Sequence, residues 1–173
     1  MKIIISGTPG TGKSMVAAKV GELTETRVIS ITDFAKKSKL GKEIDIRSLK
    51  KLLLKELKKK KTYVVEGHLA CEFKIPADFV FVLRTHPTIL KKRLLPRGYG
   101  IKKLEENLFA EMLDYCTQRT ETEYGKPPLE IDTTRLTANG TARKIVSAIK
   151  KRKEILDRVD YSGEIKKYLK LKK

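Results

Sequence analysis

The chain has 173 residues, 40% hydrophobic and 35% charged, which is enough for one globular domain with a sizeable core. Its apolar runs are far shorter than the roughly 20 residues of a membrane helix. It opens on a strand pattern where a secretory signal would begin, so we expect a soluble, cytoplasmic protein with no membrane partner. Its two cysteines, Cys71 and Cys116, are too few for a disulfide framework, and we expect two isolated thiols in a reducing compartment.

The net charge of +18 is concentrated in two stretches: residues 36–61 carry +9 and residues 141–173 carry +8. Two interpretations stay open. The lysines form solvated helix faces, as in many proteins from hot environments, or they form a surface for a polyanion such as RNA or a ribonucleoprotein. Aromatic residues make up 6% of the chain and do not alternate with the basic runs, which argues against recognition by base stacking.

The first expected element is a buried strand at residues 2–6, followed by a glycine-rich turn at 7–14 and a helix that begins near residue 15. The turn reads GTPGTGKS and matches G-x-x-x-x-G-K-[ST], the phosphate-binding P-loop pattern. Its glycines allow backbone N–H groups to point at phosphate oxygens, and the helix N-terminus favours the same anion. Lys13 can reach the β- and γ-phosphates of a nucleotide, and the Ser14 hydroxyl can ligate Mg²⁺.

Strands and helices alternate along the rest of the chain. Apolar runs predict strands at residues 27–31, 62–68, 79–84 and 127–132. Helical patterns are predicted from Asp33 as a possible cap, at 48–58, 88–95, 102–123 and 139–158, and in a short basic tail after Gly163; residues 38–46 read as a turn. Strands without polar alternation suit a parallel sheet buried on both faces. The pattern therefore predicts an α/β fold of the P-loop NTPase class, with helices on both faces of a parallel sheet and one domain over residues 1–173.

An acid and a histidine follow the third expected strand. Glu66 ends that strand, where P-loop folds place an acid near the metal, so it could ligate Mg²⁺ or orient a nucleophile. His68 lies two residues further on and could hydrogen-bond a phosphate or a water molecule. The alternatives are an exposed strand-end acid and a packed histidine.

Three arginines are further candidates, because guanidinium groups match the charge that spreads over a transferring phosphoryl group. Arg93 and Arg97 flank a short segment that is followed by Gly98 and Gly100, which is typical of a mobile lid. Arg84 ends the fourth expected strand, at the edge of the sheet where α/β folds bind ligands. The alternative for each is an ordinary surface arginine.

Taken together, these residues resemble the adenylate kinase isoenzyme 6 family, that of the coilin-interacting nuclear ATPase, and the chain looks like an archaeal member. The resemblance extends to about residue 149 and rests on segments 7–14, 66–68, 80–85, 93–99 and 102–107. It implies a nucleoside monophosphate kinase that transfers the γ-phosphoryl group of ATP to AMP with Mg²⁺, and that also hydrolyses ATP. It also implies ribosome biogenesis and rRNA processing, with a small-subunit ribosomal protein and pre-ribosomal RNA as partners.

The resemblance also implies roles for segments and residues. Residues 30–50 would form a small monophosphate-binding segment, residues 96–107 a short lid, and residues 150–173 are a basic helical tail outside the resemblance. Residues expected at ATP are Gly10, Thr11, Gly12, Lys13, Ser14, Met15 and Arg97. Residues expected to be catalytic are Lys13, Glu66, His68 and Arg97. Asp33, Arg84 and Arg93 are expected at the monophosphate, and Ser14 and Glu66 at the metal. Eukaryotic members place Asp where this chain has Glu66, and their monophosphate-binding segment is longer.

Three functions stay open at this point. The first is an adenylate kinase, which converts ATP and AMP into two ADP. The second is an ATP-hydrolysing ribosome assembly factor in which AMP kinase activity is incidental. The third is a kinase of another small molecule, such as shikimate, since a short P-loop kinase with an arginine lid does not exclude it.

Overall fold

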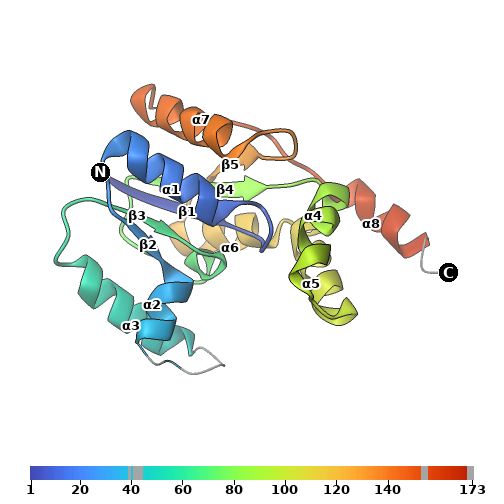
Figure 1. Ribbon diagram of the computed structural model, residues 1–173, viewed down its shortest axis with the longest axis horizontal. Coiled ribbons are helices and arrows are strands. Elements are labelled where there is room, and N and C mark those ends of the chain that lie inside the picture. Colours follow the sequence, from blue (N-terminus) through green and yellow to red (C-terminus); the bar gives the residue numbers. More distant parts are fainter. Residues whose placement is uncertain (39, 41–44, 153–155, 171–173) are drawn as a thin grey trace.

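Five strands run parallel through the centre of the molecule. They are β1 (Lys2–Gly7), β2 (Val28–Ser30), β3 (Tyr63–Glu66), β4 (Phe79–Arg84) and β5 (Leu129–Asp132). The computed structural model describes residues 1–38, 40, 45–152 and 156–170, and in it the strand order is β2-β3-β1-β4-β5 (Figure 1). β1 is central: Ile3 is in register with Val64 of β3 on one side and with Phe79 of β4 on the other.

Helices cover both faces of this sheet. They are α1 (Lys13–Thr24), α2 (Ile31–Lys37), α3 (Ile46–Leu57), α4 (Pro87–Leu94), α5 (Ile101–Met112), α6 (Tyr115–Tyr124), α7 (Ala138–Lys150) and α8 (Ser162–Lys170), with 3-10 turns η1 (His68–Cys71) and η2 (Leu95–Arg97). α1 and α7 lie over one face, and α2, α3 and α6 lie over the other (Figure 1). Because β1 and β3 are covered on both faces, their apolar residues do not alternate with polar ones. The predicted fold class is confirmed.

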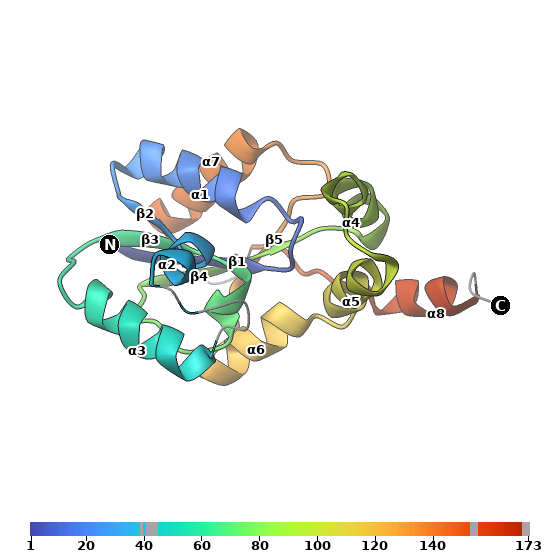
Figure 2. The same cartoon turned by 60° about the horizontal axis from the view of Figure 1, so that its bottom comes forward.

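Two apolar cores hold the layers together. Val16, Val20 and Ile145 of α1 and α7 pack against Ile3 on one face. Leu49, Leu53 and Leu57 form an apolar stripe on α3, and they pack against the other face with Ile4 and Val65 of the sheet. α4, α5 and α8 gather beyond the carboxyl ends of the strands (Figure 2), around a third apolar cluster.

The helix predicted over residues 102–123 is wrong as a single element. The chain forms two helices, α5 and α6, which are separated by Leu113 and Asp114. Asp114 adopts a left-handed conformation with φ 53°, and its carboxylate accepts a hydrogen bond from the buried Arg84. The Arg84 guanidinium also donates a 3.0 Å hydrogen bond to the carbonyl oxygen of Glu111. A carbonyl group in the last turn of α5 therefore bonds to a side chain, and the helix does not continue.

Two helix starts also differ from the prediction. The Ser30 hydroxyl caps α2 by accepting from the Asp33 N–H at 3.4 Å, so Asp33 lies in the first turn instead of at the cap. Asp45 caps α3 by accepting from the N–H groups of Arg47 and Ser48, at 3.2 and 2.9 Å, so the helix begins at Ile46, two residues before the predicted start. Part of the turn predicted at 38–46 lies outside the described residues.

The C-terminal part of the chain is divided differently from the prediction. α7 ends at Lys150, not near residue 158, and Gly163 lies within α8 instead of separating it from the chain before it. Part of the predicted tail, residues 153–155 and 171–173, lies outside the described residues. Among the residues that are described, no helix is long and apolar enough to cross a membrane.

Candidate functional site

The phosphate loop connects β1 to α1 at the carboxyl edge of the sheet. Gly10 and Gly12 have φ values of 97° and 96°, which side chains rarely adopt. A Cβ atom at Gly10 would lie 2.7 Å from Leu90 Cδ1 of α4 and 2.9 Å from Leu94 Cδ2. The loop is therefore packed tightly on α4, and a glycine is required there for space as well as for conformation.

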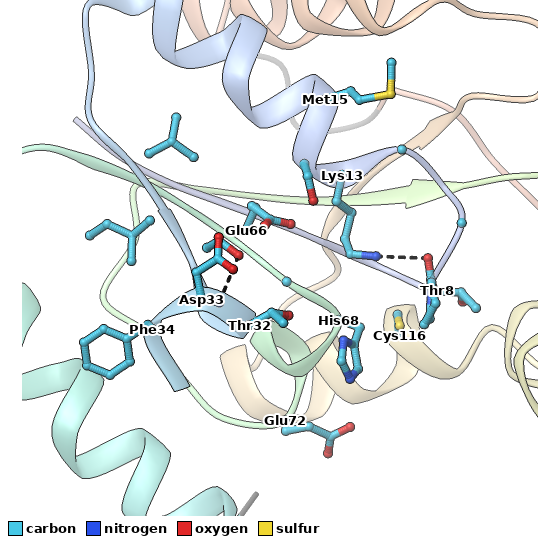
Figure 3. Close-up of a pocket in the computed structure, with 18 of the residues that line it drawn as sticks. Thr8, Lys13, Met15, Thr32, Asp33, Phe34, Glu66, His68, Glu72 and Cys116 are labelled. Atoms are coloured by element: carbon cyan, nitrogen blue, oxygen red, sulfur yellow. Dashed lines mark hydrogen bonds between the residues drawn. The ribbon is translucent and has the colours of Figure 1, made fainter. Parts of the chain in front are cut away.

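Lys13 points back into this loop. Its Nζ donates a 3.0 Å hydrogen bond to the Thr8 carbonyl oxygen, and the side chain is only 8% exposed (Figure 3). Burial lowers the pKa of Lys13, and the nearby Cys116 and Glu66 partly oppose that shift. A phosphate at this position would stabilise the ammonium ion, because it would place opposite charge beside it.

A cavity of about 1210 Å³ opens in front of the loop. It is bounded by the phosphate loop, α2, η1 and a segment that runs from Arg97 into α5. The cavity exceeds the roughly 300–1,000 Å³ that is usual for a single small-molecule site. It has room for a ligand larger than one nucleotide, or for two ligands side by side.

Glu66 and His68 both face this cavity, from the end of β3 and the start of η1 (Figure 3). Glu66 is 4% exposed and is close enough to Lys13 to raise the pKa of that lysine. Burial lowers the pKa of His68, and the nearby Lys13 ammonium lowers it further. The neutral imidazole is therefore favoured near physiological pH, and it can accept or donate a hydrogen bond.

The first turn of α2 forms the opposite wall. Thr32, Asp33 and Phe34 line the cavity there, and Asp33 is exposed (Figure 3). Residues 39 and 41–44 of the predicted monophosphate-binding segment lie outside the described residues.

The predicted lid begins at η2. Arg97 is exposed and lines the cavity, and Gly98 after it has φ 66°. Tyr99 and Lys103 line the cavity too, with the Lys103 ammonium 4.5 Å from the centre of the Tyr99 ring. The structure therefore brings Gly10, Gly12, Lys13, Ser14, Met15, Asp33, Glu66, His68 and Arg97 to one cavity. Thr11 supports the loop from inside, since its hydroxyl donates to the Thr8 carbonyl oxygen at 2.9 Å.

Arg84 is not brought to this cavity. It is 1% exposed, and its guanidinium forms ion pairs with Glu111, Asp114 and Glu130. The distance from Arg84 Nε to Glu111 Oε1 is 3.0 Å. The three carboxylates raise the pKa of Arg84, although burial alone would lower it. All its donor nitrogens are engaged within the protein, so we leave Arg84 out of the candidate site.

Arg93 also bonds within the protein. Its guanidinium donates to the Thr133 carbonyl oxygen at 2.9 Å and to the Thr85 hydroxyl at 3.2 Å. The Thr133 hydroxyl in turn lies 3.2 Å from the carbonyl oxygen of Thr11. Arg93 therefore connects α4 to the segment after β5 and, through that segment, to the phosphate loop.

Several residues that line the cavity have no functional signal in the sequence. Glu72 accepts from the Tyr115 hydroxyl at 2.9 Å and pairs with Arg119 at 3.3 Å. Arg27 and Lys37 add positive charge near β2. No motif marks these residues, because their partners are distant in the sequence or come from different elements.

Comparisons with known proteins give consistent results. The model of the AAA domain family matches residues 3–114. A protein of Methanocaldococcus jannaschii named "Putative adenylate kinase" is 37% identical over 180 residues, covering 99% of this chain and 98% of the relative. A protein of the same name from Pyrococcus furiosus is 36% identical, again over 99% of this chain and 98% of the relative.

Solved structures of low sequence identity share the fold. Shikimate kinase from Acinetobacter baumannii, in complex with shikimate, superposes with a TM-score of 0.65 at 20% identity, over 88% of this chain and 94% of that chain. Deoxyadenosine kinase from M. mycoides, with bound dATP, gives a TM-score of 0.61 at 18% identity, over 87% of this chain and 100% of that chain. At these identities the likeness concerns the fold alone.

Proposed function

The chain belongs to the archaeal family whose members are named "Putative adenylate kinase", and on that premise we propose that it transfers the γ-phosphoryl group of ATP to AMP. The predicted resemblance to adenylate kinases is confirmed at the level of this family, while the narrower isoenzyme 6 label stays a prediction. The reaction would convert ATP and AMP into two ADP.

The observation that supports this proposal best is the single cavity shared by the phosphate loop, the α2 wall and the arginine-bearing lid. Phosphoryl transfer needs little covalent chemistry from the protein and depends on positioning and on charge stabilisation. Lys13 and Arg97 supply positive charge from two sides of that cavity, and its volume of about 1210 Å³ leaves room for a donor and an acceptor nucleotide.

The donor would lie on the phosphate loop. The backbone N–H groups from Gly10 to Met15 would hold the β- and γ-phosphates, with Lys13 bridging them. Ser14 and Glu66 fit a Mg²⁺ ion, because a hydroxyl and a carboxylate face one cavity and this hard cation is usually held by one or two protein oxygens together with phosphates and waters. When bound, Mg²⁺ would neutralise charge on the phosphate oxygens.

The acceptor would lie against α2, with its phosphate oxygen in line with the γ-phosphorus. Asp33 on α2 would contact the acceptor, and Arg97 would approach the transferring group when the lid closes. Closure would exclude water, which otherwise competes with AMP as the nucleophile. His68 and Glu66 would orient the acceptor phosphate or the water near it.

Hydrolysis of ATP is the second candidate, and the position of Glu66 and His68 favours it. Both side chains face the cavity next to Lys13, where together they could orient a water molecule for attack. The ribosomal protein and RNA partners remain predictions. Lys50, Lys51 and Lys55 of α3, with Lys58 directly after it, form an exposed basic face. A solvated helix and a polyanion-binding surface would both have such a face.

The decisive experiment follows the label from γ-³²P-ATP with Mg²⁺ and with AMP, shikimate or no acceptor. Label in ADP only when AMP is present supports the kinase. Label released as inorganic phosphate at a rate that AMP does not change supports the ATPase, and label in shikimate phosphate supports the third alternative. Lys13→Ala should abolish turnover with the fold intact, and Lys19→Ala is the matched control because Lys19 lies on the exposed side of the same helix, paired with Glu22 at 2.8 Å.

A further inference from the structure

The two cysteines of the chain lie together, although they are 45 positions apart in the sequence and isolated thiols were expected. Cys71 ends η1 and Cys116 is in the first turn of α6, and the two pack with Val82 in one small buried cluster. They are 1% and 6% exposed. Both are free thiols, as expected, but the packing of α6 against η1 brings them into contact, which the sequence did not predict.

This thiol pair lies directly beneath the phosphate loop. Cys116 borders the nucleotide cavity beside Thr8 (Figure 3). Cys71 is not among the residues that line the cavity. The Thr8 hydroxyl is buried, has no hydrogen-bond partner among the described residues and lies close enough to Cys116 to lower the pKa of that thiol. The Cys71 sulfur lies 3.0 Å from the carbonyl oxygen of His68.

The surroundings make the two thiols unequal. Contact with Cys71, followed by the Lys13 ammonium and the Thr8 hydroxyl, lowers the pKa of Cys116 against the opposing effect of burial. Contact with Cys116 and burial raise the pKa of Cys71. A thiolate is the reactive form of cysteine, so Cys116 is the more reactive of the two and also the one that a molecule in the cavity meets first.

We propose that Cys71 and Cys116 form an oxidation site under the phosphate loop, which a peroxide converts into a disulfide that slows nucleotide turnover. The Cys116 sulfur attacks one peroxide oxygen and the O–O bond breaks. The sulfur is oxidised to a sulfenic acid, and the second oxygen leaves as water. The Cys71 sulfur then attacks the Cys116 sulfur, the S–O bond breaks, and the hydroxyl group leaves as water with the proton of Cys71.

The disulfide would change the loop in two ways. It would remove the thiolate character beside Lys13, and it would pull η1, which carries His68, toward α6. Because misplacing groups by about 1 Å at a reaction centre can cost about a hundredfold in rate, we expect a loss of turnover of roughly tenfold to a hundredfold. A nucleotide on the loop would cover the route to Cys116 and should slow the oxidation.

The test treats the pre-reduced protein with hydrogen peroxide, with and without ATP and Mg²⁺, and maps its peptides without reduction. We expect a Cys71–Cys116 cross-link that forms more slowly with ATP, a fall in turnover, and recovery with dithiothreitol. In Cys71→Ser, which lies outside the cavity lining, we expect a sulfenic acid on Cys116 that dimedone captures and no cross-link. No other thiol of the chain can give the signal, since it has two cysteines.

Two results would overturn the proposal: thiols that are oxidised separately without a cross-link in the unmutated protein, or a cross-link that leaves turnover unchanged. The cross-link and its protection by ATP are measured on the unmutated chain, so they do not depend on whether the serine variant folds. The chemical step does not rest on the proposed function. If the protein hydrolyses ATP without phosphorylating AMP, the peptide map and the ATPase rate still decide the proposal.

Discussion

Replacing Arg84 with methionine tests whether this arginine holds the fold or binds substrate. The change leaves the Glu111 carboxylate, which is 1% exposed, with the Thr85 N–H at 2.9 Å as its one remaining donor among the described residues, and it removes the ion pairs to Asp114 and Glu130. Removing one partner of a buried ion pair costs about 3–5 kcal/mol, because the other charge remains buried. For a chain of this length, about 2–4 °C per kcal/mol gives a fall in Tm of about 6–20 °C.

Thermal unfolding followed by circular dichroism measures this loss, and two variants provide controls. Arg84→Met combined with Glu111→Gln should recover part of it, because the amide oxygen still accepts from Thr85 while the buried charge is gone. Arg119→Met removes an arginine that is 35% exposed and pairs with Glu72, so its effect should stay below about 1 kcal/mol. Below its Tm, Arg84→Met should keep the KM for AMP of the unmutated protein.

The opposite result would refute this reasoning. If Arg84→Met melts within about 2 °C of the unmutated protein, a shift that corresponds to less than about 1 kcal/mol, the ion pairs contribute little. If its KM for AMP also rises at least about tenfold, which is about 1.4 kcal/mol of binding, Arg84 contacts substrate as the sequence pattern predicted.

Three further predictions concern the loop and the lid. Gly10→Ala places a Cβ 2.7 Å from Leu90 Cδ1 at a φ of 97°, so calorimetry should show ATP affinity falling at least about tenfold, and unchanged affinity would contradict the packing argument. Burial lowers the pKa of Lys13, and a bound phosphate would restore its charge. ATP affinity should therefore fall as the pH rises through that lowered pKa toward 10.5, and ATP binding should take up a proton. A binding heat that does not depend on the buffer would contradict this proton uptake. Tyr168→Ala removes an edge-on contact with Phe109, at 5.3 Å between ring centres, and should lower the free energy of unfolding by about 0.5–1.5 kcal/mol; an unchanged urea midpoint would show that α8 does not stabilise α5.

The sequence was sufficient for the sheet and the phosphate loop because their signals are local. Apolar runs without polar alternation mark strands that are covered on both faces, and the glycine spacing of residues 7–14 leaves few other conformations. The predicted cap of α2, Asp33, lies three residues after the observed cap, Ser30. Both residue types are good helix caps, and the structure distinguishes them because the Ser30 hydroxyl accepts from the Asp33 N–H.

The roles of the arginines could not be predicted, because their partners come from distant parts of the chain. The ion-pair partners of Arg84 follow it by 27 to 46 residues, and the break between α5 and α6 depends on that same guanidinium. The contact of Cys71 with Cys116 is also a product of packing between elements. Local sequence patterns indicate which residue types lie at the edge of a sheet, but tertiary contacts determine which of them face the ligand.

The contacts around the phosphate loop limit which part of the lid can move. Leu90 and Leu94 of α4 fill the space over Gly10, and Arg93 of α4 bonds to Thr133, which reaches the loop. α4 is therefore fixed to the loop from two sides, while α8 holds α5 through its apolar contacts. In the segment between them, Arg97 is exposed and Gly98 and Gly100 have open space around them, while Tyr99 packs against the apolar cluster of α4 and α5. We expect closure over a nucleotide to be a movement of this segment alone, which carries Arg97 inward while α4 stays in place.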